Sequence, residues 1–130
     1  MSDKRHNICV VDDDPSICRA LSRVIKLAGF NVKAYISARD FLGDKQLKNI
    51  DLLLLDIKMP VMDGFALQEH LSATGINIPL VFMTAHEADK MRTKAMEKGA
   101  AAFLQKPIDE KDLLGAINKG LKNRKRGKNQ

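Results

Sequence analysis

The stretch that decides the fold is Asp51-Leu52-Leu53-Leu54-Leu55-Asp56-Ile57-Lys58-Met59-Pro60. Its four consecutive leucines do not alternate with polar residues, as they would in a strand with one solvated face. The run therefore predicts a central parallel strand covered on both faces. Asp56 follows at once, and Met59-Pro60 and Asp63-Gly64 then break the chain. Because ligands bind at the carboxyl ends of parallel strands, Asp56 is a candidate functional residue, although alone it also fits a simple turn.

The chain as a whole has the composition of one small globular domain. It has 130 residues, of which 45% are hydrophobic. No apolar run is long enough to cross a bilayer, and the first residues are too polar for a signal peptide. Cys9 and Cys18 lack CxxC spacing, so we expect buried thiols in a reducing compartment rather than a disulfide. These features predict a cytoplasmic protein without membrane association.

Positive charge is concentrated at the end of the chain. The last twelve residues carry six cations and no acid: Lys119, Lys122, Arg124, Lys125, Arg126 and Lys128. These six charges equal the net charge of +6, so the rest of the chain is neutral overall. We therefore expect a domain at residues 1–122 and a basic tail or linker at 123–130. Nucleic-acid binding is disfavoured because no aromatic residue interleaves the charges to stack on bases.

Five strand-and-helix units follow one another along the chain. Apolar runs predict strands at 7–11, 31–35, 51–56, 79–83 and 101–105, and helical patterns follow at 15–28, 37–48, 63–75, 87–98 and 109–121. In the first helix, Ile17, Leu21, Val24 and Ala28 recur at spacings of three and four, which predicts an amphipathic face. Such alternation predicts an α/β fold: a five-stranded parallel sheet with helices on both faces. Right-handed crossovers favour the flavodoxin-like strand order 2-1-3-4-5.

Polar residues gather where these strands end. The first strand leads to Asp12 and Asp13, the third to Asp56, the fourth to Thr84 and the fifth to Lys106. Three neighbouring carboxylates need a compensating charge, and oxygen ligands favour Mg²⁺, whereas no Cys/His cluster supports zinc. A carboxylate with a metal, a lysine and a hydroxyl beside it suits phosphoryl transfer, with the carboxylate as nucleophile. Asp56 is the best acceptor, although each residue taken singly also has an ordinary structural explanation.

Five blocks occur in order along the chain: Val10-Val11-Asp12-Asp13-Asp14, Asp56-Ile57-Lys58-Met59-Pro60 with Asp63-Gly64, Met83-Thr84-Ala85, Gly99-Ala100 and Lys106-Pro107. Together they resemble the receiver domain of two-component response regulators, over about residues 7–121. The resemblance implies a phosphorylation-dependent signalling switch in a phosphorelay. It implies no enzyme activity beyond the domain's own phosphorylation and dephosphorylation.

The resemblance also implies roles for the acidic residues. Asp56 would be phosphorylated by a sensor histidine kinase or a phosphotransfer protein. Asp13, Asp56 and the backbone carbonyl of Lys58 would bind Mg²⁺, and Asp12 would help through water. Lys58 and His86 lie two residues after Asp56 and Thr84, where side chains flank the entry of attacking water and tune dephosphorylation.

Three more residues acquire roles from the resemblance. Thr84 would bond the phosphoryl group and move with it, Lys106 would pair with its charge, and the Lys106–Pro107 peptide would be cis. Phe103 matches the family's aromatic switch residue and is also consistent with an ordinary core aromatic. The face formed by the fourth helix, the fifth strand and the fifth helix would carry the change to a downstream protein target or to an output domain absent from this sequence. A homodimer through the last two helices remains open.

Other functions fit the sequence less well. A phosphohydrolase of small substrates would place a second aspartate where Lys58 stands. A flavin binder conflicts with the acidic edge, which would repel the flavin phosphate, and with the absence of tryptophan. A receiver-like interaction module that works without phosphorylation stays open as the alternative.

Overall fold

Five parallel strands form one sheet in the order β2-β1-β3-β4-β5, which confirms the predicted order. The structure is a computed structural model that describes residues 5–128, with side chains described through residue 123. The strands are β1 (Asn7–Val11), β2 (Asn31–Tyr35), β3 (Leu52–Asp56), β4 (Leu80–Thr84) and β5 (Ala102–Gln105). The helices are α1 (Pro15–Leu27), α2 (Ala38–Leu42), α3 (Gly64–Ala73), α4 (Ala88–Glu97) and α5 (Glu110–Lys128), with a short 3-10 helix, η1, at Leu47–Asn49.

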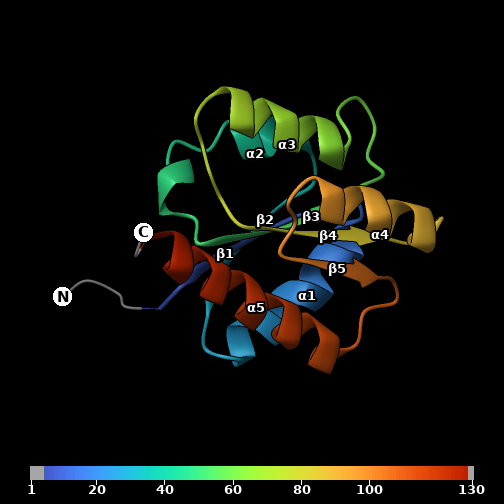
Figure 1. Cartoon of the computed structure of the whole chain (residues 1–130). Helices are drawn as coiled ribbons and strands as arrows, with labels where there is room; N and C mark the ends of the chain where they lie inside the picture. Colours follow the sequence, from blue (N-terminus) through green and yellow to red (C-terminus); the bar gives the residue numbers. More distant parts are fainter. Residues whose placement is uncertain (1–4, 129–130) are drawn as a thin grey trace.

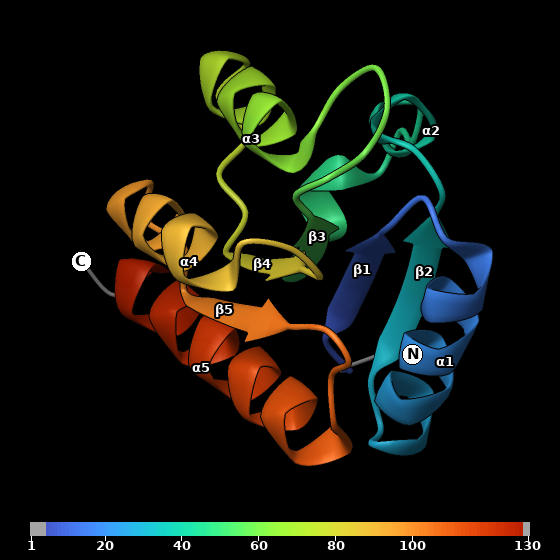
Figure 2. The ribbon, with the colours of Figure 1, turned by 90° about the vertical axis from the view of Figure 1, so that its right-hand side faces the viewer.

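The helices lie on both faces of the sheet, with α2, α3 and α4 on one side and α1 and α5 on the other (Figures 1 and 2). The four leucines of β3 are fully buried and divide between the two sides. Leu53 and Leu55 pack in the apolar cluster beneath α2, α3 and α4, whereas Leu52 and Leu54 pack in the cluster beneath α1 and α5. The unbroken run of leucines thus reflects a strand covered on both faces, as predicted.

Side chains cap the starts of four helices. The carboxylates of Asp14, Asp63 and Asp109 accept from the backbone N–H groups of Ser16 (2.9 Å), Ala66 (2.9 Å) and Asp112 (2.7 Å). The Ser37 hydroxyl accepts from the N–H of Asp40 at 3.0 Å. Each cap satisfies a backbone donor that the first turn leaves without a partner. These caps fix where the chain turns from a strand end into a helix.

The amphipathic face predicted for α1 is confirmed in part, because Leu21 is buried and Ile17 and Val24 pack against the same core cluster. Cys18, Leu21 and Ile25 are buried, whereas Ile17 and Val24 are half-buried and Ala28 is exposed. The Cys18 thiol donates to the carbonyl of Asp12 at 3.3 Å, so the start of α1 turns its cysteine toward the sheet.

Two helix ends also differ from the prediction. α2 stops at Leu42 instead of continuing toward residue 48, because Gly43 follows and the Asp44 carboxylate then accepts from the N–H of Gln46 in a turn. At the other end of the chain, α5 runs to Lys128, beyond the predicted helix end at residue 121. The described part of the basic segment, residues 123–128, is therefore helical, and residues 129–130 lie outside the described residues.

Both cysteines are buried and free, as expected. Across residues 5–128, no helix combines the length and apolar character that a membrane span requires.

Candidate functional site

Asp12 and Asp13 lie at the end of β1 but differ in exposure. Asp12 is completely buried, its N–H donates to the carbonyl of Tyr35 at 3.1 Å, and its carboxylate accepts from the N–H of Asp14 at 2.9 Å. Asp13 is exposed. The chain therefore holds one carboxylate rigidly inside the edge of the sheet and presents the next one to solvent.

Asp56 ends β3 and is only 4% exposed. The N–H of the next residue, Ile57, donates to the carbonyl of Met83 in β4 at 2.9 Å. The chain therefore stays paired with β4 beyond Asp56. Gly64, at the start of α3, then returns its N–H to the carbonyl of Ile57 at 2.9 Å. A Cβ on Gly64 would lie 2.5 Å from the backbone oxygen of Asp56, so glycine is required for this close return.

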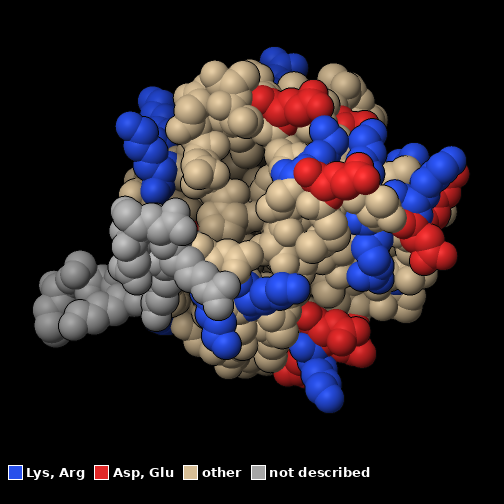
Figure 3. All heavy atoms as spheres, viewed as in Figure 1, with Lys and Arg blue, Asp and Glu red and all other residues tan. Residues whose placement is uncertain are grey.

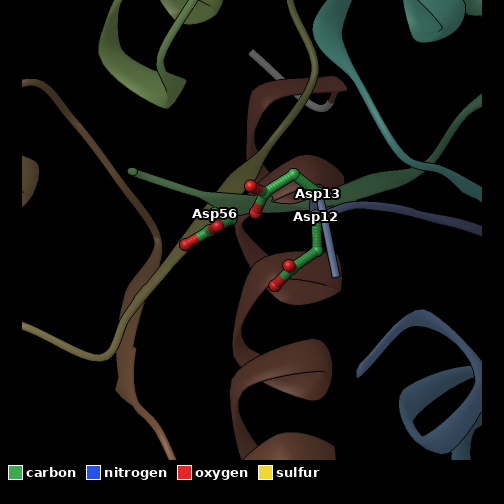
Figure 4. A group of neighbouring side chains, drawn as sticks. All are labelled: Asp12, Asp13 and Asp56. Carbon is green, nitrogen blue, oxygen red and sulfur yellow. The ribbon is translucent and has the colours of Figure 1, made fainter. Parts of the chain in front are cut away.

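One carboxylate oxygen from each of Asp12, Asp13 and Asp56 lies within 4.8 Å of the others. Figure 4 shows the three side chains gathered at this edge of the sheet. The predicted acidic cluster is therefore assembled from two neighbouring strands. Its oxygen donors are of the kind that Mg²⁺ prefers.

Lys106 joins the two buried carboxylates. It follows β5, and its N–H donates to the carbonyl of Thr84 at 2.8 Å. Its ammonium group lies 2.6 Å from Asp12 and 3.3 Å from Asp56. The Lys106–Pro107 peptide is cis, as predicted.

Burial and the neighbouring charges shift the pKa values of Asp56 and Lys106. Burial raises the pKa of the Asp56 carboxyl to about 6, the negative charge of Asp12 adds to the rise, and Lys106 opposes it. Burial alone would lower the pKa of Lys106, but its contacts with Asp12 and Asp56 outweigh burial, and its pKa is raised. Lys106 therefore stays cationic, whereas ionised Asp56 is held at an energetic cost.

Thr84 ends β4 and is completely buried. Its hydroxyl donates to the carbonyl of His86 at 3.1 Å and accepts from the N–H of His86 at 3.3 Å. The hydroxyl is thus engaged with the backbone of the following loop. Movement of Thr84 toward another partner would break these two bonds.

The remaining predicted residues surround this group. Lys58 and His86 are exposed on the loops that follow β3 and β4. Phe103 is 7% exposed in β5, beside Phe82 of β4, and packs in the cluster beneath α2, α3 and α4. Sequence reasoning missed Arg92 of α4, whose guanidinium lies 4.8 Å from the centroid of the Phe103 ring. No sequence pattern marks that contact, because Arg92 alone resembles any surface residue of a charged helix.

Asp56→Asn is expected to stabilise the metal-free protein. A folded-state pKa near 6, above the ordinary 3.8, means that folding favours the protonated carboxyl. The stability that the raised pKa of Asp56 contributes is fully present below about pH 4 and is lost as the pH rises to about 6. At about pH 7.5 the free energy of unfolding of the asparagine variant should therefore be about 1–3 kcal/mol larger than that of the unsubstituted protein.

Urea denaturation in a chelator across this pH range measures the effect. Asp40→Asn, an exposed position on α2, is the control and should change stability little. Equal stability of the Asp56→Asn and unsubstituted proteins at about pH 7.5 would contradict the proposed cost of ionising Asp56.

Comparison with known protein families settles the class of protein. The family model of the response regulator receiver domain matches residues 8–118. The chain belongs to the response regulator receiver domain family. Receiver domains are parts of signalling proteins that interact with histidine kinases or phosphotransfer proteins.

This receiver domain has relatives among named response regulators. It is 40% identical over 122 residues to the response regulator protein TmoT of Ectopseudomonas mendocina. This alignment covers 94% of this chain and 56% of TmoT. It is 34% identical over 114 residues to the tetrathionate response regulatory protein TtrR of Salmonella typhimurium. This alignment covers 88% of this chain and 55% of TtrR. The receiver domain thus spans about half the length of these relatives.

Solved structures share the fold of this receiver domain. The response regulator StyR has a TM-score of 0.87 and 39% identity, over 96% of this chain and 63% of StyR. FixJ-N has a TM-score of 0.80 and 31% identity, over 94% of this chain and 96% of FixJ-N. The predicted family and fold are both confirmed.

Proposed function

We propose that this receiver domain is a phosphorylation-dependent switch. Asp56 accepts a phosphoryl group from a histidine kinase or a phosphotransfer protein, and the domain relays the event through the surface of α4, β5 and α5. The observation that carries the proposal is the ammonium group of Lys106, which contacts both Asp12 and Asp56 beside a cluster of three carboxylates. A simple turn aspartate would not need a buried cation and two further carboxylates.

The oxygen-rich cluster fits a bound Mg²⁺. Asp13, Asp56 and the backbone carbonyl of Lys58 would hold the ion, with Asp12 acting through water. When bound, Mg²⁺ neutralises the carboxylates and the oxygens of the transferring phosphoryl group. This ligand set matches the preference of Mg²⁺ for oxygen and for only a few protein carboxylates.

The residues of the chain would perform the transfer by positioning and charge. A carboxylate oxygen of Asp56 attacks the phosphorus atom, forming a P–O bond as the bond from phosphorus to the donor breaks, and the donor leaves with that electron pair. Lys106 then pairs with the added negative charge. Dephosphorylation is the attack of water on the same phosphorus atom, which restores the Asp56 carboxylate and releases phosphate. No separate substrate is turned over.

Switching would follow from the new charge. The phosphoryl group adds strong acceptor oxygens, and the Thr84 hydroxyl is drawn to them from the backbone of His86. The space that Thr84 leaves allows Phe103 to turn, so that the α4–β5–α5 surface changes shape. A downstream protein or an output domain reads that surface.

Intact mass after incubation with acetyl phosphate tests the proposal. With Mg²⁺ the protein should gain the mass of one phosphoryl group, and the gain should be lost in a chelator and in Asp56→Asn. Asp40→Asn should gain the group normally. No gain in folded, metal-supplied protein would contradict the proposal and favour an interaction module that works without phosphorylation.

His86→Ala is expected to lengthen the lifetime of the phosphorylated state by roughly tenfold, below the full effect of a positioned general base. The imidazole follows Thr84 by two residues and is exposed, so it can hydrogen-bond water at the mouth of the site. Lys58→Ala, on the opposite loop, should also change the hydrolysis rate. Loss of phosphoprotein with time, followed by intact mass, measures both rates.

Neither substitution should alter folding stability by more than about 0.5 kcal/mol, because both side chains are exposed. Hydrolysis rates that match the unsubstituted protein in both variants would exclude these residues from dephosphorylation.

A further inference from the structure

α4 is attached to the sheet by unusually little apolar surface. Within its range, Ala88–Glu97, only Ala95 is fully buried, and Ala88 and Met91 are partly buried against the core. Most other side chains are charged and exposed, and Figure 3 shows basic and acidic groups interspersed over this part of the surface. Apolar burial alone therefore holds α4 weakly, and other contacts must contribute to its position.

Cations of α4 and its C-terminal cap supply such contacts. The Arg92 guanidinium lies 4.8 Å from the centroid of the Phe103 ring. The ammonium groups of Lys94 and Lys98 lie 4.6 Å and 5.6 Å from the ring of Phe65 in α3. A cation within about 6 Å of a ring face is attracted to it. Arg92 is thus the cation that covers the ring of the proposed switch residue.

The same helix begins next to the proposed phosphoryl site. The Thr84 hydroxyl makes two bonds with the backbone of His86. Glu87 follows in a left-handed conformation, with φ of 50°, and α4 starts at the next residue. Movement of Thr84 would therefore disturb the loop that places the first turn of α4. Arg92 lies on the following turn, so the contact with Phe103 is coupled to that loop.

We propose that Arg92 is a positioning residue for the switch. Its guanidinium holds the Phe103 ring in the resting conformation, and switching requires this contact to break. The inference rests on the proposed function, because it assigns a restraint on the same two-state element. The ordinary strength of a partly exposed cation–π contact corresponds to a shift of about 2–5-fold in the switching equilibrium.

The test uses beryllium fluoride with Mg²⁺ as a mimic of the bound phosphoryl group. The protein is labelled with fluorophenylalanine, and the Phe103 resonance among the five phenylalanines is assigned with Phe103→Leu. Arg92→Gln should move the Phe103 resonance of the free protein toward its position with beryllium fluoride. It should also raise the apparent affinity for beryllium fluoride by about 2–5-fold.

Lys94→Gln is the matched control, because it removes a cation of the same helix from Phe65 instead of Phe103. It should move the Phe65 resonance and leave the affinity for beryllium fluoride unchanged. Arg92→Lys keeps a cation and should restore most of the resting behaviour. A general loss of α4 packing would affect Arg92→Gln and Lys94→Gln alike.

Two results would overturn the inference, and they can be told apart from failure of the proposed function. In the first, the unsubstituted protein responds to beryllium fluoride but Arg92→Gln responds with the same affinity. In the second, the Phe103 resonance of the free protein does not move in Arg92→Gln. If the unsubstituted protein neither responded to beryllium fluoride nor gained a phosphoryl group, that result would contradict the proposed function itself. It would also contradict the switching role of Arg92.

Discussion

Lys106→Met should lower the free energy of unfolding of the metal-free protein by about 3 kcal/mol near neutral pH. Removing one partner of a buried ion pair leaves the other charge without compensation, which is among the costliest single changes. Lys106 lies 2.6 Å from Asp12, which is completely buried, and 3.3 Å from Asp56, which is nearly so. Methionine fills similar space but supplies no charge. Urea denaturation in a chelator measures the loss.

The same substitution should raise the pKa of Asp56 above about 6, because Lys106 opposes the rise caused by burial and by Asp12. It should also tighten Mg²⁺ binding, since the cluster loses its internal cation. Mg²⁺ should therefore restore more stability to Lys106→Met than to the unsubstituted protein.

Lys33→Met is the control for Lys106→Met. Lys33 is largely exposed and lies 3.7 Å from Asp44, so its loss should cost less than about 1 kcal/mol. Equal losses in the two variants would show that Lys106 does not compensate the buried carboxylates.

Gly64→Ala should destabilise the domain by about 2–3 kcal/mol, the range for forcing atoms into a packed interior. The added Cβ would lie 2.5 Å from the backbone oxygen of Asp56 and 3.0 Å from the Cα of Ile57. These are backbone atoms, so the strand end itself must move. Phosphoryl incorporation on Asp56 should fall together with stability, because the acceptor is displaced.

Gly115→Ala is the control for Gly64→Ala. Gly115 lies in α5, and an added Cβ would have no neighbour within 4 Å. Alanine there should be neutral or stabilising by about 0.5–1 kcal/mol, since glycine weakens a helix interior. If Gly64→Ala proved as stable as Gly115→Ala, the close return of α3 against Asp56 would be wrong.

The sheet and the placement of the candidate site at one edge of it could be predicted because the sequence encodes them locally. The leucines of β3 indicate burial on both faces, and Asp14, Ser37, Asp63 and Asp109 indicate helix starts by short-range hydrogen bonds. Chain order and crossover handedness then bring the strand ends to one edge. Asp12, Asp56, Thr84 and Lys106 meet there for that reason, although no pattern gives the distances between them.

The features that were missed depend on contacts between elements. Arg92 reaches Phe103 only because α4 lies against β5, and Gly64 approaches Asp56 only because the loop after β3 folds back. The apolar stripe predicted for α1 left out Cys18, which donates to the carbonyl of Asp12, and it included Ala28, which is exposed. Such contacts depend on the tertiary direction of each side chain, which periodicity does not encode.

In the proposed switch, Asp56 itself carries the phosphoryl group. Borohydride reduction of acetyl phosphate-treated protein converts an aspartyl phosphate to homoserine, and peptide mass spectrometry then locates the changed residue. We expect homoserine at position 56 alone, formed only with Mg²⁺. Homoserine at position 12 or 13, or none in protein that has gained phosphoryl mass, would contradict the account.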